Sequence, residues 1–225
     1  MIIVTGASKG LGKSIAENLH KKGEEVIGLS RSSCSPNINF IECDVGNYTS
    51  VKQATKIIKK KGKPIKALIN AAGIASMNMA LTTDEKTVQK IIQTNLVGTI
   101  YTCQLFAPLM LRKKKGLIIN FSTVAVALAI KGESVYAASK AGVETFTRAF
   151  AREMSDFNIR VNCIAPGPIK TDLLKGITKS QIDKITSQQI LSRQFKKSDI
   201  CNLVELLIDD KASSISGQTL HVGGI

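Results

Sequence analysis

Residues 2–12 read IIVTGASKGLG, a short apolar run followed at once by glycines at positions 6, 10 and 12. The run IIVT is apolar and rich in β-branched residues, which is typical of a buried strand. Glycines between a strand and a helix allow a tight turn and a close approach of the backbone to a phosphate group. The spacing G-x-x-x-G-x-G differs from the commoner G-x-G-x-x-G of dinucleotide-binding proteins. Three glycines could also form an ordinary loop, but their place after a strand favours a pyrophosphate-binding turn.

The pattern of strand followed by helix continues outward from this turn along the chain. Short apolar runs predict strands at 2–5, 25–30, 39–44, 66–70, 116–122, 159–165 and 218–222. Longer segments between them predict helices at about 12–21, 49–61, 84–111, 135–156 and 198–209. This alternation predicts a doubly wound (Rossmann) α/β fold, with a parallel sheet of about seven strands and helices on both faces. No linker or tandem repeat interrupts it, so we expect residues 1–225 to form a single domain.

The composition limits the classes of function. Hydrophobic residues are 44% and charged residues 21% of the 225 residues, which suits a globule with one core. The five cysteines are scattered without a C-x-x-C pair, which favours reduced thiols in the cytoplasm over a zinc site. His20 and His221 stand at opposite ends of the chain, so we expect no metal centre and no Ser-His-Asp hydrolase. We see no export signal, and the longest apolar runs, such as 124–130, are too short to span a bilayer. We therefore expect a cytoplasmic protein without a membrane partner.

The net charge of +14 leaves two interpretations open. Short basic runs at 21–22, 59–61, 112–115 and 196–197 suit solvated helix ends. They would equally attract an acidic partner. Aromatic residues are only 4% and no RNA-binding motif accompanies the charge, so we expect no nucleic-acid partner.

The end of the second predicted strand bears on the choice of dinucleotide. It reads Leu29-Ser30-Arg31, without the acidic residue that would bind the adenosine ribose of NAD. A cation at this place suits a 2′-phosphate instead, and Lys9 in the glycine turn could approach the same group. Either cation alone could be an ordinary surface charge. Together they favour NADP(H) over NAD(H).

The sequence holds two copies of Tyr-x-x-x-Lys. One is Tyr136 with Lys140, within SVYAASKAG at 134–142, and the other is Tyr48 with Lys52. Residues four apart share a helix face, so an ammonium can lie beside a phenol in either copy. The motif alone does not choose between them.

Strand placement favours the copy at Tyr136. In parallel sheets ligands bind beyond the carboxyl ends of the strands. Thr123, thirteen positions before Tyr136, follows the predicted strand 116–122, whereas Ser35, thirteen positions before Tyr48, lies in a predicted loop. We therefore expect Tyr136 to face the ligand.

With these motifs in order, the chain resembles a short-chain dehydrogenase/reductase over essentially its whole length. Besides the glycine turn, the resemblance rests on Asp44-Val45, Asn70-Ala71-Ala72-Gly73, Asn95, Tyr136-Ala137-Ala138-Ser139-Lys140 and Pro166-Gly167-Pro168-Ile169-Lys170-Thr171. It implies that the cofactor is bound by Gly6, Ser8, Lys9, Gly10, Leu11, Gly12, Ser30, Arg31, Asp44, Val45, Asn70, Ala71, Ala72, Gly73, Tyr136, Lys140, Pro166, Gly167, Ile169 and Thr171.

The resemblance also implies the catalytic roles. Tyr136 would donate a proton to a substrate carbonyl as hydride arrives from the nicotinamide. Lys140 and the oxidised nicotinamide would lower the pKa of the phenol, which is ordinarily about 10, and Lys140 would also bind the nicotinamide ribose. Asn95 would order a water that links Lys140 to solvent.

The residue that orients the carbonyl departs from the family pattern. The family usually has serine thirteen positions before the tyrosine, where this chain has Thr123, with Ser122 just before it. Neighbours on a strand point to opposite faces, so only one of them should aim at the substrate. Spacing favours Thr123, which keeps the hydroxyl.

The C-terminal third narrows the resemblance to the 3-oxoacyl-[acyl-carrier-protein] reductases. It has Thr171-Asp172-Leu173, an Ile-x-x-Gln segment, an R-x-x-x-x-x-(D/E)-I segment and the ending GQTLHV at 217–222. The implied reaction is NADPH-dependent reduction of a 3-oxoacyl thioester on an acidic acyl carrier protein. Lys113–Lys115 would be either its docking patch or a solvated helix end.

Two alternatives to the acyl-carrier substrate stay open. Relatives with similar endings act on other small ketones or alcohols, such as sugars, polyols, diketones or secondary metabolites, and the ending HVGGI is one residue shorter than the family pattern. A non-catalytic NADP-binding regulator is the alternative from another class. The resemblance further implies a homodimer or homotetramer, formed partly by the helices predicted at 84–111 and 135–156.

Overall fold

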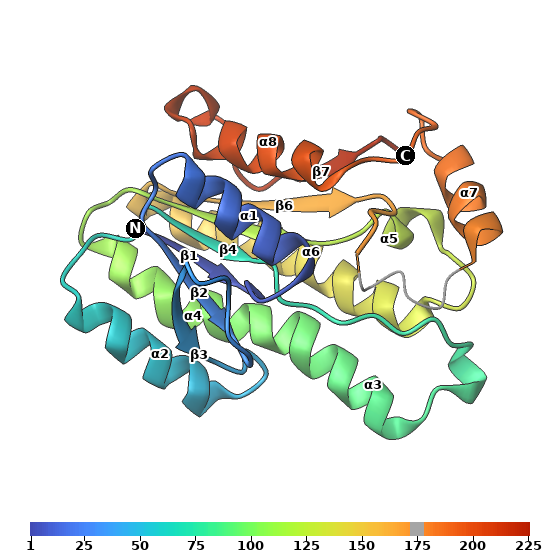
Figure 1. Cartoon of the computed structure of the whole chain (residues 1–225), viewed down its shortest axis with the longest axis horizontal. Helices are drawn as coiled ribbons and strands as arrows, with labels where there is room; N and C mark the ends of the chain where they lie inside the picture. The colour runs from blue at the N-terminus through green and yellow to red at the C-terminus, as the bar shows by residue number, and fades with distance from the viewer. Residues whose placement is uncertain (172–177) are drawn as a thin grey trace.

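A computed structural model describes residues 1–171 and 178–225 of the chain. Its centre is one sheet of seven parallel strands in the order β3-β2-β1-β4-β5-β6-β7 (Figure 1). The strands are β1 (Ile2–Thr5), β2 (Val26–Ser30), β3 (Asn39–Glu42), β4 (Ala67–Asn70), β5 (Gly116–Phe121), β6 (Ile159–Pro166) and β7 (Thr219–Val222). The predicted doubly wound α/β fold with about seven parallel strands is confirmed.

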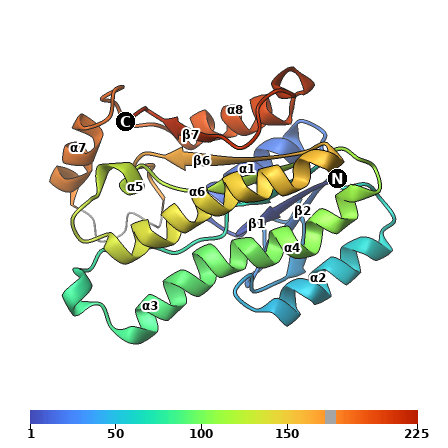
Figure 2. The same cartoon turned by 180° about the vertical axis from the view of Figure 1, so that it is seen from behind.

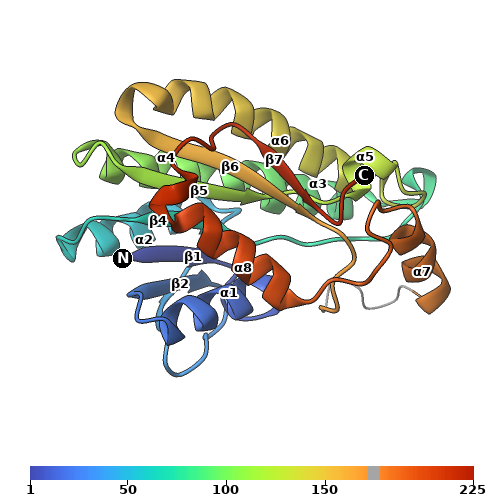
Figure 3. The same ribbon diagram turned by 90° about the horizontal axis from the view of Figure 1, so that it is seen from above.

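Helices cover both faces of the sheet. They are α1 (Gly10–Lys21), α2 (Tyr48–Lys60), α3 (Glu85–Ile92), α4 (Gly98–Leu111), α5 (Ala125–Leu128), α6 (Ser134–Met154), α7 (Lys179–Ser187) and α8 (Lys197–Ile208). Figure 3 shows α1 and α8 on one side of the sheet and α4 and α6 on the other, and Figure 2 shows α2 and α4 together on that second side. Each side has its own apolar core, because the strands are buried on both faces and present aliphatic side chains to both.

The strand order creates a switch point beside β1. The chain runs from β1 to β2 and β3 on one side, and then returns to place β4 on the other side of β1. The connections after β1 and β4 therefore leave in opposite directions and open a crevice at their carboxyl ends. The glycine turn and the segment after Asn70 both lie at this crevice.

The central helix predicted at 84–111 differs from a regular α-helix. It contains α3, then a π-helical stretch (Gln93–Val97), and then α4 (Figure 2). Asn95 lies within the π-helical stretch, and its side chain is fully buried. Short π-helical insertions of this kind are frequent at functional sites.

Two helices were not predicted, α5 and α7. Both follow the carboxyl ends of strands, α5 after β5 and α7 after β6. They are short, and the apolar run 124–130 gave no helical periodicity. Over the residues that the structure describes, no helix combines the length and apolarity needed to cross a membrane.

Candidate active site

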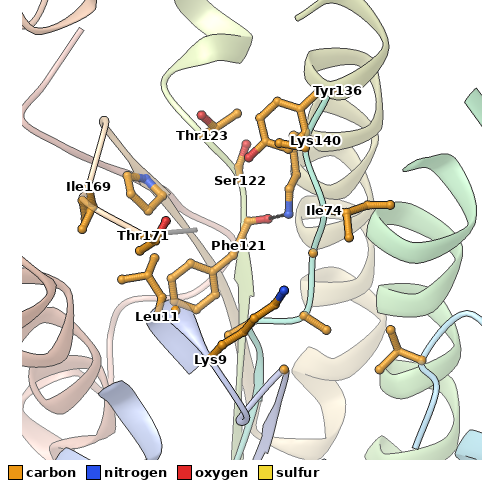
Figure 4. A pocket seen from close by; sticks show the side chains of 18 of the residues that line it. Lys9, Leu11, Ile74, Phe121, Ser122, Thr123, Tyr136, Lys140, Ile169 and Thr171 are labelled. Carbon is orange, nitrogen blue, oxygen red and sulfur yellow. Dashed lines mark hydrogen bonds between the residues drawn. The ribbon is translucent and has the colours of Figure 1, made fainter. Parts of the chain in front are cut away.

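A cavity of about 530 Å³ opens at the carboxyl ends of the strands (Figure 4). It brings together most of the residues predicted for the site. Those that line it are Gly6, Ser8, Lys9, Gly10, Leu11, Ser30, Arg31, Asp44, Val45, Ala71, Ala72, Gly73, Ser122, Thr123, Tyr136, Lys140, Pro166, Gly167, Ile169 and Thr171. Gly12, Asn70 and Asn95 are not among the lining residues and lie behind the wall.

Close packing explains two of the glycines in the turn after β1. A Cβ atom on Gly6 would lie 2.8 Å from the Cα atom of Ala72, and one on Gly12 would lie 2.4 Å from the carbonyl oxygen of Gly6. Both distances are too short for any side chain. The turn therefore packs against the segment after β4 and starts α1 directly over the crevice.

The geometry of the turn suits a pyrophosphate. The space beside Gly10 is open, because a Cβ atom there would meet nothing within 4 Å. The N-terminus of α1 lies at the same place, and the first N–H groups of a helix favour an anion. The same cavity is lined by this turn, by Arg31 and by Tyr136, so it reaches from the end of β2 to the start of α6.

The end of the cavity beside β2 and β3 carries two cations. Lys9 and Arg31 both line it with exposed side chains. Neither forms an ion pair within the described part of the chain. The nearby Asp44 accepts a hydrogen bond from the backbone N–H of Gly46 at 2.9 Å. This end is therefore suited to a phosphate group.

The other end of the cavity holds Tyr136 and Lys140 on the first turns of α6. Lys140 is only 5% exposed, and its ammonium donates a hydrogen bond to the backbone carbonyl of Phe121 at 2.8 Å (Figure 4). Phe121 is the last residue of β5, so this bond ties the helix to the strand end. Thr123 follows two residues later, on the same side of the cavity as Tyr136.

The surroundings change the pKa of both side chains. Burial is the largest cause that raises the pKa of Tyr136, and the charge of Glu133 raises it further, whereas a hydrogen bond with Thr123 lowers it. Burial lowers the pKa of Lys140 to about 8. The expectation that Lys140 lowers the pKa of the phenol is therefore not met by the protein alone. The ammonium is bonded to Phe121, and the net effect of the protein on the phenol has the opposite sign.

The two candidate hydroxyls at the end of β5 have different partners. Ser122 donates a hydrogen bond to a carboxylate oxygen of Glu144 at 2.5 Å. Thr123 accepts a hydrogen bond from the backbone N–H of Ala125 at 3.2 Å. Both residues line the cavity, but only Thr123 interacts with the phenol of Tyr136, whereas Ser122 donates its proton to Glu144.

Asn95 and Asn70 support the wall of the cavity from behind. The side chain of Asn95 bonds both backbone groups of Ile74 at 2.9 Å and donates to the hydroxyl of Ser139 at 3.0 Å. Asn70 donates to the side-chain oxygen of Asn120 at 2.9 Å. A Cβ atom on Gly73 would lie 3.4 Å from both Asn95 and Lys140. Asn95 is thus placed next to Lys140 without lining the cavity.

Comparison with known proteins agrees with this geometry. Residues 6–224 match the model of a family described as enoyl-(acyl carrier protein) reductase. The 3-oxoacyl-[acyl-carrier-protein] reductase FabG of Staphylococcus epidermidis is 34% identical over 235 residues, covering 99% of this chain and 96% of that protein. The FabG protein of Escherichia coli K12 is 32% identical over 231 residues, covering 99% and 95%. The chain belongs to the short-chain dehydrogenase/reductase family.

A solved structure extends the likeness to another substrate class. The ligand-free aldohexose dehydrogenase of Thermoplasma acidophilum has a TM-score of 0.89 and 32% identity, covering 99% of this chain and 92% of that one. Membership of the short-chain dehydrogenase/reductase family identifies the protein as an oxidoreductase with a nicotinamide cofactor.

Several residues at the substrate end were not predicted, although they line this reductase cavity. They are Ile74, Ala75, Val124, Ile130, Glu133 and Ile185. Glu133 was detectable in principle, because residues three apart share a helix face and Tyr136 follows it by three. Ile185 on α7 had no local signal, since only the fold brings α7 to the cavity.

Of the two interpretations of Lys113–Lys115, the structure favours a solvated helix end over a docking patch. These residues precede β5 and therefore lie at the amino ends of the strands, opposite the cavity. The ammonium of Lys115 pairs with Asp210 at 3.0 Å, and Lys113 and Lys115 line a separate groove at that edge. A six-residue strand spans about 20 Å, so the patch lies on the wrong side of the sheet for a carrier-bound substrate. Asp172 and Leu173, part of the predicted Thr171-Asp172-Leu173 element, lie outside the described residues.

Proposed function

We propose that the chain reduces a carbonyl group to a secondary alcohol with NADPH, and that its substrate is a 3-oxoacyl thioester on acyl carrier protein. The observation that carries the proposal is a single cavity with a phosphate-binding turn in the middle and Tyr136, Thr123 and Lys140 at one end. Full-length similarity to 3-oxoacyl-[acyl-carrier-protein] reductases supports the substrate class.

The protein groups at the substrate end would act in a defined order. NADPH, when bound, supplies the hydride. The hydroxyl of Thr123 donates a hydrogen bond to the carbonyl oxygen and orients it, and Tyr136 donates the proton that completes the alcohol. The charge of Lys140 stabilises the phenolate that Tyr136 leaves behind. Asn95 fixes the backbone of Ile74 near Lys140. It thereby supports the path along which a proton from solvent would return to Tyr136.

The preference for NADPH over NADH is proposed from charge. Lys9 and Arg31 stand at the end of the cavity where the adenosine would lie, and a 2′-phosphate there would form charge-assisted hydrogen bonds with both. Ser30 is less suited to bind the ribose, because its hydroxyl donates to the backbone carbonyl of Ser32 at 2.5 Å.

Oxidation of an aldose or reduction of another small ketone is the second candidate. The similarity to an aldohexose dehydrogenase at 32% identity favours it. Both candidate reactions use Tyr136, Thr123 and Lys140. They differ only in the part of the substrate that contacts the remaining residues of the cavity wall.

One set of assays separates these candidates. NADPH consumption is measured with acetoacetyl carrier protein, ethyl acetoacetate and crotonyl carrier protein, and NADP⁺ reduction is measured with aldohexoses. We expect the acetoacetyl carrier protein to give the highest kcat/KM. Turnover of the crotonyl substrate alone would indicate reduction of a carbon–carbon double bond, and binding of NADPH without any turnover would indicate a regulator.

Two further properties belong to the same proposal. A homodimer or homotetramer is expected, and light scattering on the purified protein measures its mass. A cytoplasmic location is supported by five cysteines that are all free thiols.

A further inference from the structure

A buried carboxylate stands in the wall of the substrate end. Glu133 directly precedes α6, lines the cavity and is 9% exposed. Its backbone is fixed at both groups, since its N–H donates to Ile130 at 3.1 Å and its carbonyl accepts from Ala137 at 2.7 Å. The backbone of Glu133 is therefore held in place at the start of the helix that carries Tyr136.

Within residues 1–171 and 178–225, no side chain explains why an acidic group is buried at this position. Glu133 has no hydrogen bond or ion pair from its carboxylate within the described residues, and it does not cap the helix that it precedes. Burial raises its pKa, and no cation acts in the opposite direction. The carboxyl group therefore lies in the cavity wall with its oxygen atoms available to a bound molecule.

The neighbours of Glu133 in the cavity define what that partner can be. Val124 and Ile130 are apolar, and the hydroxyls of Tyr136 and Thr123 are assigned to the carbonyl oxygen of the substrate. Glu133 lies three residues before Tyr136 at the start of α6, and both residues line the same end of the cavity, so the carboxylate belongs to the wall around the reacting carbonyl. Among the residues that the structure describes, the cations that line the cavity are Lys140, which is bonded to Phe121, and Lys9 and Arg31 at the opposite end.

We infer that Glu133 is a specificity-determining residue that accepts a hydrogen bond from an N–H or O–H donor near the substrate carbonyl and excludes substrates that carry a negative charge there. This inference rests on the proposed carbonyl reduction. A thioester arm offers an amide N–H and a hydroxyketone offers an O–H, whereas a free 3-oxo acid brings a second carboxylate against the first. Like charges at such short range repel, and discrimination by repulsion is as effective as discrimination by attraction.

The test compares substrates that share one carbonyl and differ beside it. They are the acetoacetyl thioester of N-acetylcysteamine with an amide donor, 4-hydroxy-2-butanone with a hydroxyl donor, ethyl acetoacetate with neither, and acetoacetate with a negative charge. The variants are Glu133→Gln, which keeps an acceptor without the charge, and Glu133→Leu, which removes both. Glu153→Gln is the matched control, because Glu153 is an exposed carboxylate on the same helix.

Ratios of kcat/KM within each variant report the discrimination. In Glu133→Gln, we expect the ratio of kcat/KM for acetoacetate to that for ethyl acetoacetate to rise by about tenfold or more. In Glu133→Leu, kcat/KM for each donor-bearing substrate should fall by about tenfold relative to that for ethyl acetoacetate, since a hydrogen bond to a charged group is lost. The two donor substrates show whether an amide or a hydroxyl is the better partner. Glu153→Gln should leave every ratio unchanged.

A binding measurement separates this inference from the proposed function. Calorimetry in the presence of NADPH gives the affinity for 3-hydroxybutyrate and for its ethyl ester without turnover, because both partners are already in the reduced state. The inference would be overturned, even if the enzyme is active, if Glu133→Gln left two ratios unchanged. They are the ratio of kcat/KM for acetoacetate to that for ethyl acetoacetate, and the ratio of the affinities for 3-hydroxybutyrate and its ethyl ester. A wild-type protein that turns over no substrate but still prefers the ester in a Glu133-dependent way would overturn the proposed function and leave the inference standing.

Discussion

The two edges of the sheet use charge in different ways. At the amino ends of the strands, cations are paired with anions: Lys22 with Glu205 at 2.6 Å, Lys63 with Glu25 at 2.9 Å, Lys66 with Glu24, and Lys115 with Asp210 at 3.0 Å. At the carboxyl ends, Lys9, Arg31 and Glu133 line a cavity and have no ion pair in the described part of the chain. The paired edge supports the fold, and the unpaired edge is available to ligands.

The largest expected effect comes from removing the proton donor at the unpaired edge. Tyr136→Phe should lower kcat for carbonyl reduction by about a thousandfold, because Tyr136 is the proposed proton donor and Thr123 only orients the carbonyl. Affinity for NADPH, measured by fluorescence titration, should change by less than about threefold. Tyr48→Phe is the control, since Tyr48 is exposed and packs edge-on against Tyr101 outside the cavity. Equal losses in the two variants would show that the wrong tyrosine has been chosen.

The two hydroxyls at the end of β5 should differ in importance. Thr123→Val should lower kcat/KM by about a hundredfold, the usual cost of removing one donor to a developing oxyanion. Thr123→Ser should restore most of it. Ser122→Ala should cost less, because Ser122 is bonded to Glu144 rather than facing the substrate with its proton. A larger loss in Ser122→Ala than in Thr123→Val would reverse the assignment.

The cations at the adenosine end should control the choice of cofactor. Arg31→Asp should shift the ratio of kcat/KM for NADPH to that for NADH by about tenfold to a hundredfold towards NADH, because a charge-assisted bond to the 2′-phosphate is replaced by repulsion. Lys9→Gln should produce a smaller shift in the same direction. An unchanged ratio in both variants would mean that the 2′-phosphate binds elsewhere.

The lowered pKa of Lys140 predicts a pH dependence. Its ammonium loses its proton as the pH rises through about 8. The phenolate of Tyr136 is then less stabilised, so kcat for reduction should fall on the alkaline side of that value. Stopped-flow measurement of NADPH oxidation across this pH range tests for the alkaline fall in kcat. The Lys140→Arg variant should be less active, but its kcat should not fall above pH 8, because the guanidinium keeps its proton.

The smallest effect is expected at the paired edge. Lys115→Gln should change the free energy of unfolding by less than about 1 kcal/mol, since exposed ion pairs contribute little. It should leave kcat/KM for a carrier-bound substrate unchanged. A raised KM for the carrier protein but not for the small thioester would place docking at the amino edge and contradict the contrast between the two edges.

The sequence predicted those features that depend on local pattern. Gly6 and Tyr136 could be placed because each follows a recognisable strand, and the positions of the strands along the chain followed from their apolar runs. The partners of Lys115 and Lys140 could not be predicted, because Asp210 and Phe121 are brought there by the packing of elements distant in the sequence. The effect of burial on the pKa of Tyr136 could not be predicted for the same reason, since burial is a property of the fold.

The central claim is that one cavity joins NADPH to a carbonyl held by Tyr136 and Thr123. The most direct measurement is the stoichiometry of the reaction with acetoacetyl carrier protein, with NADPH followed by absorbance and the acyl group by mass spectrometry. We expect one NADPH consumed for each 3-hydroxybutyryl group formed, and none of either with Tyr136→Phe. Tight binding of NADPH with no change in the mass of this substrate or of a simple ketone would contradict the account.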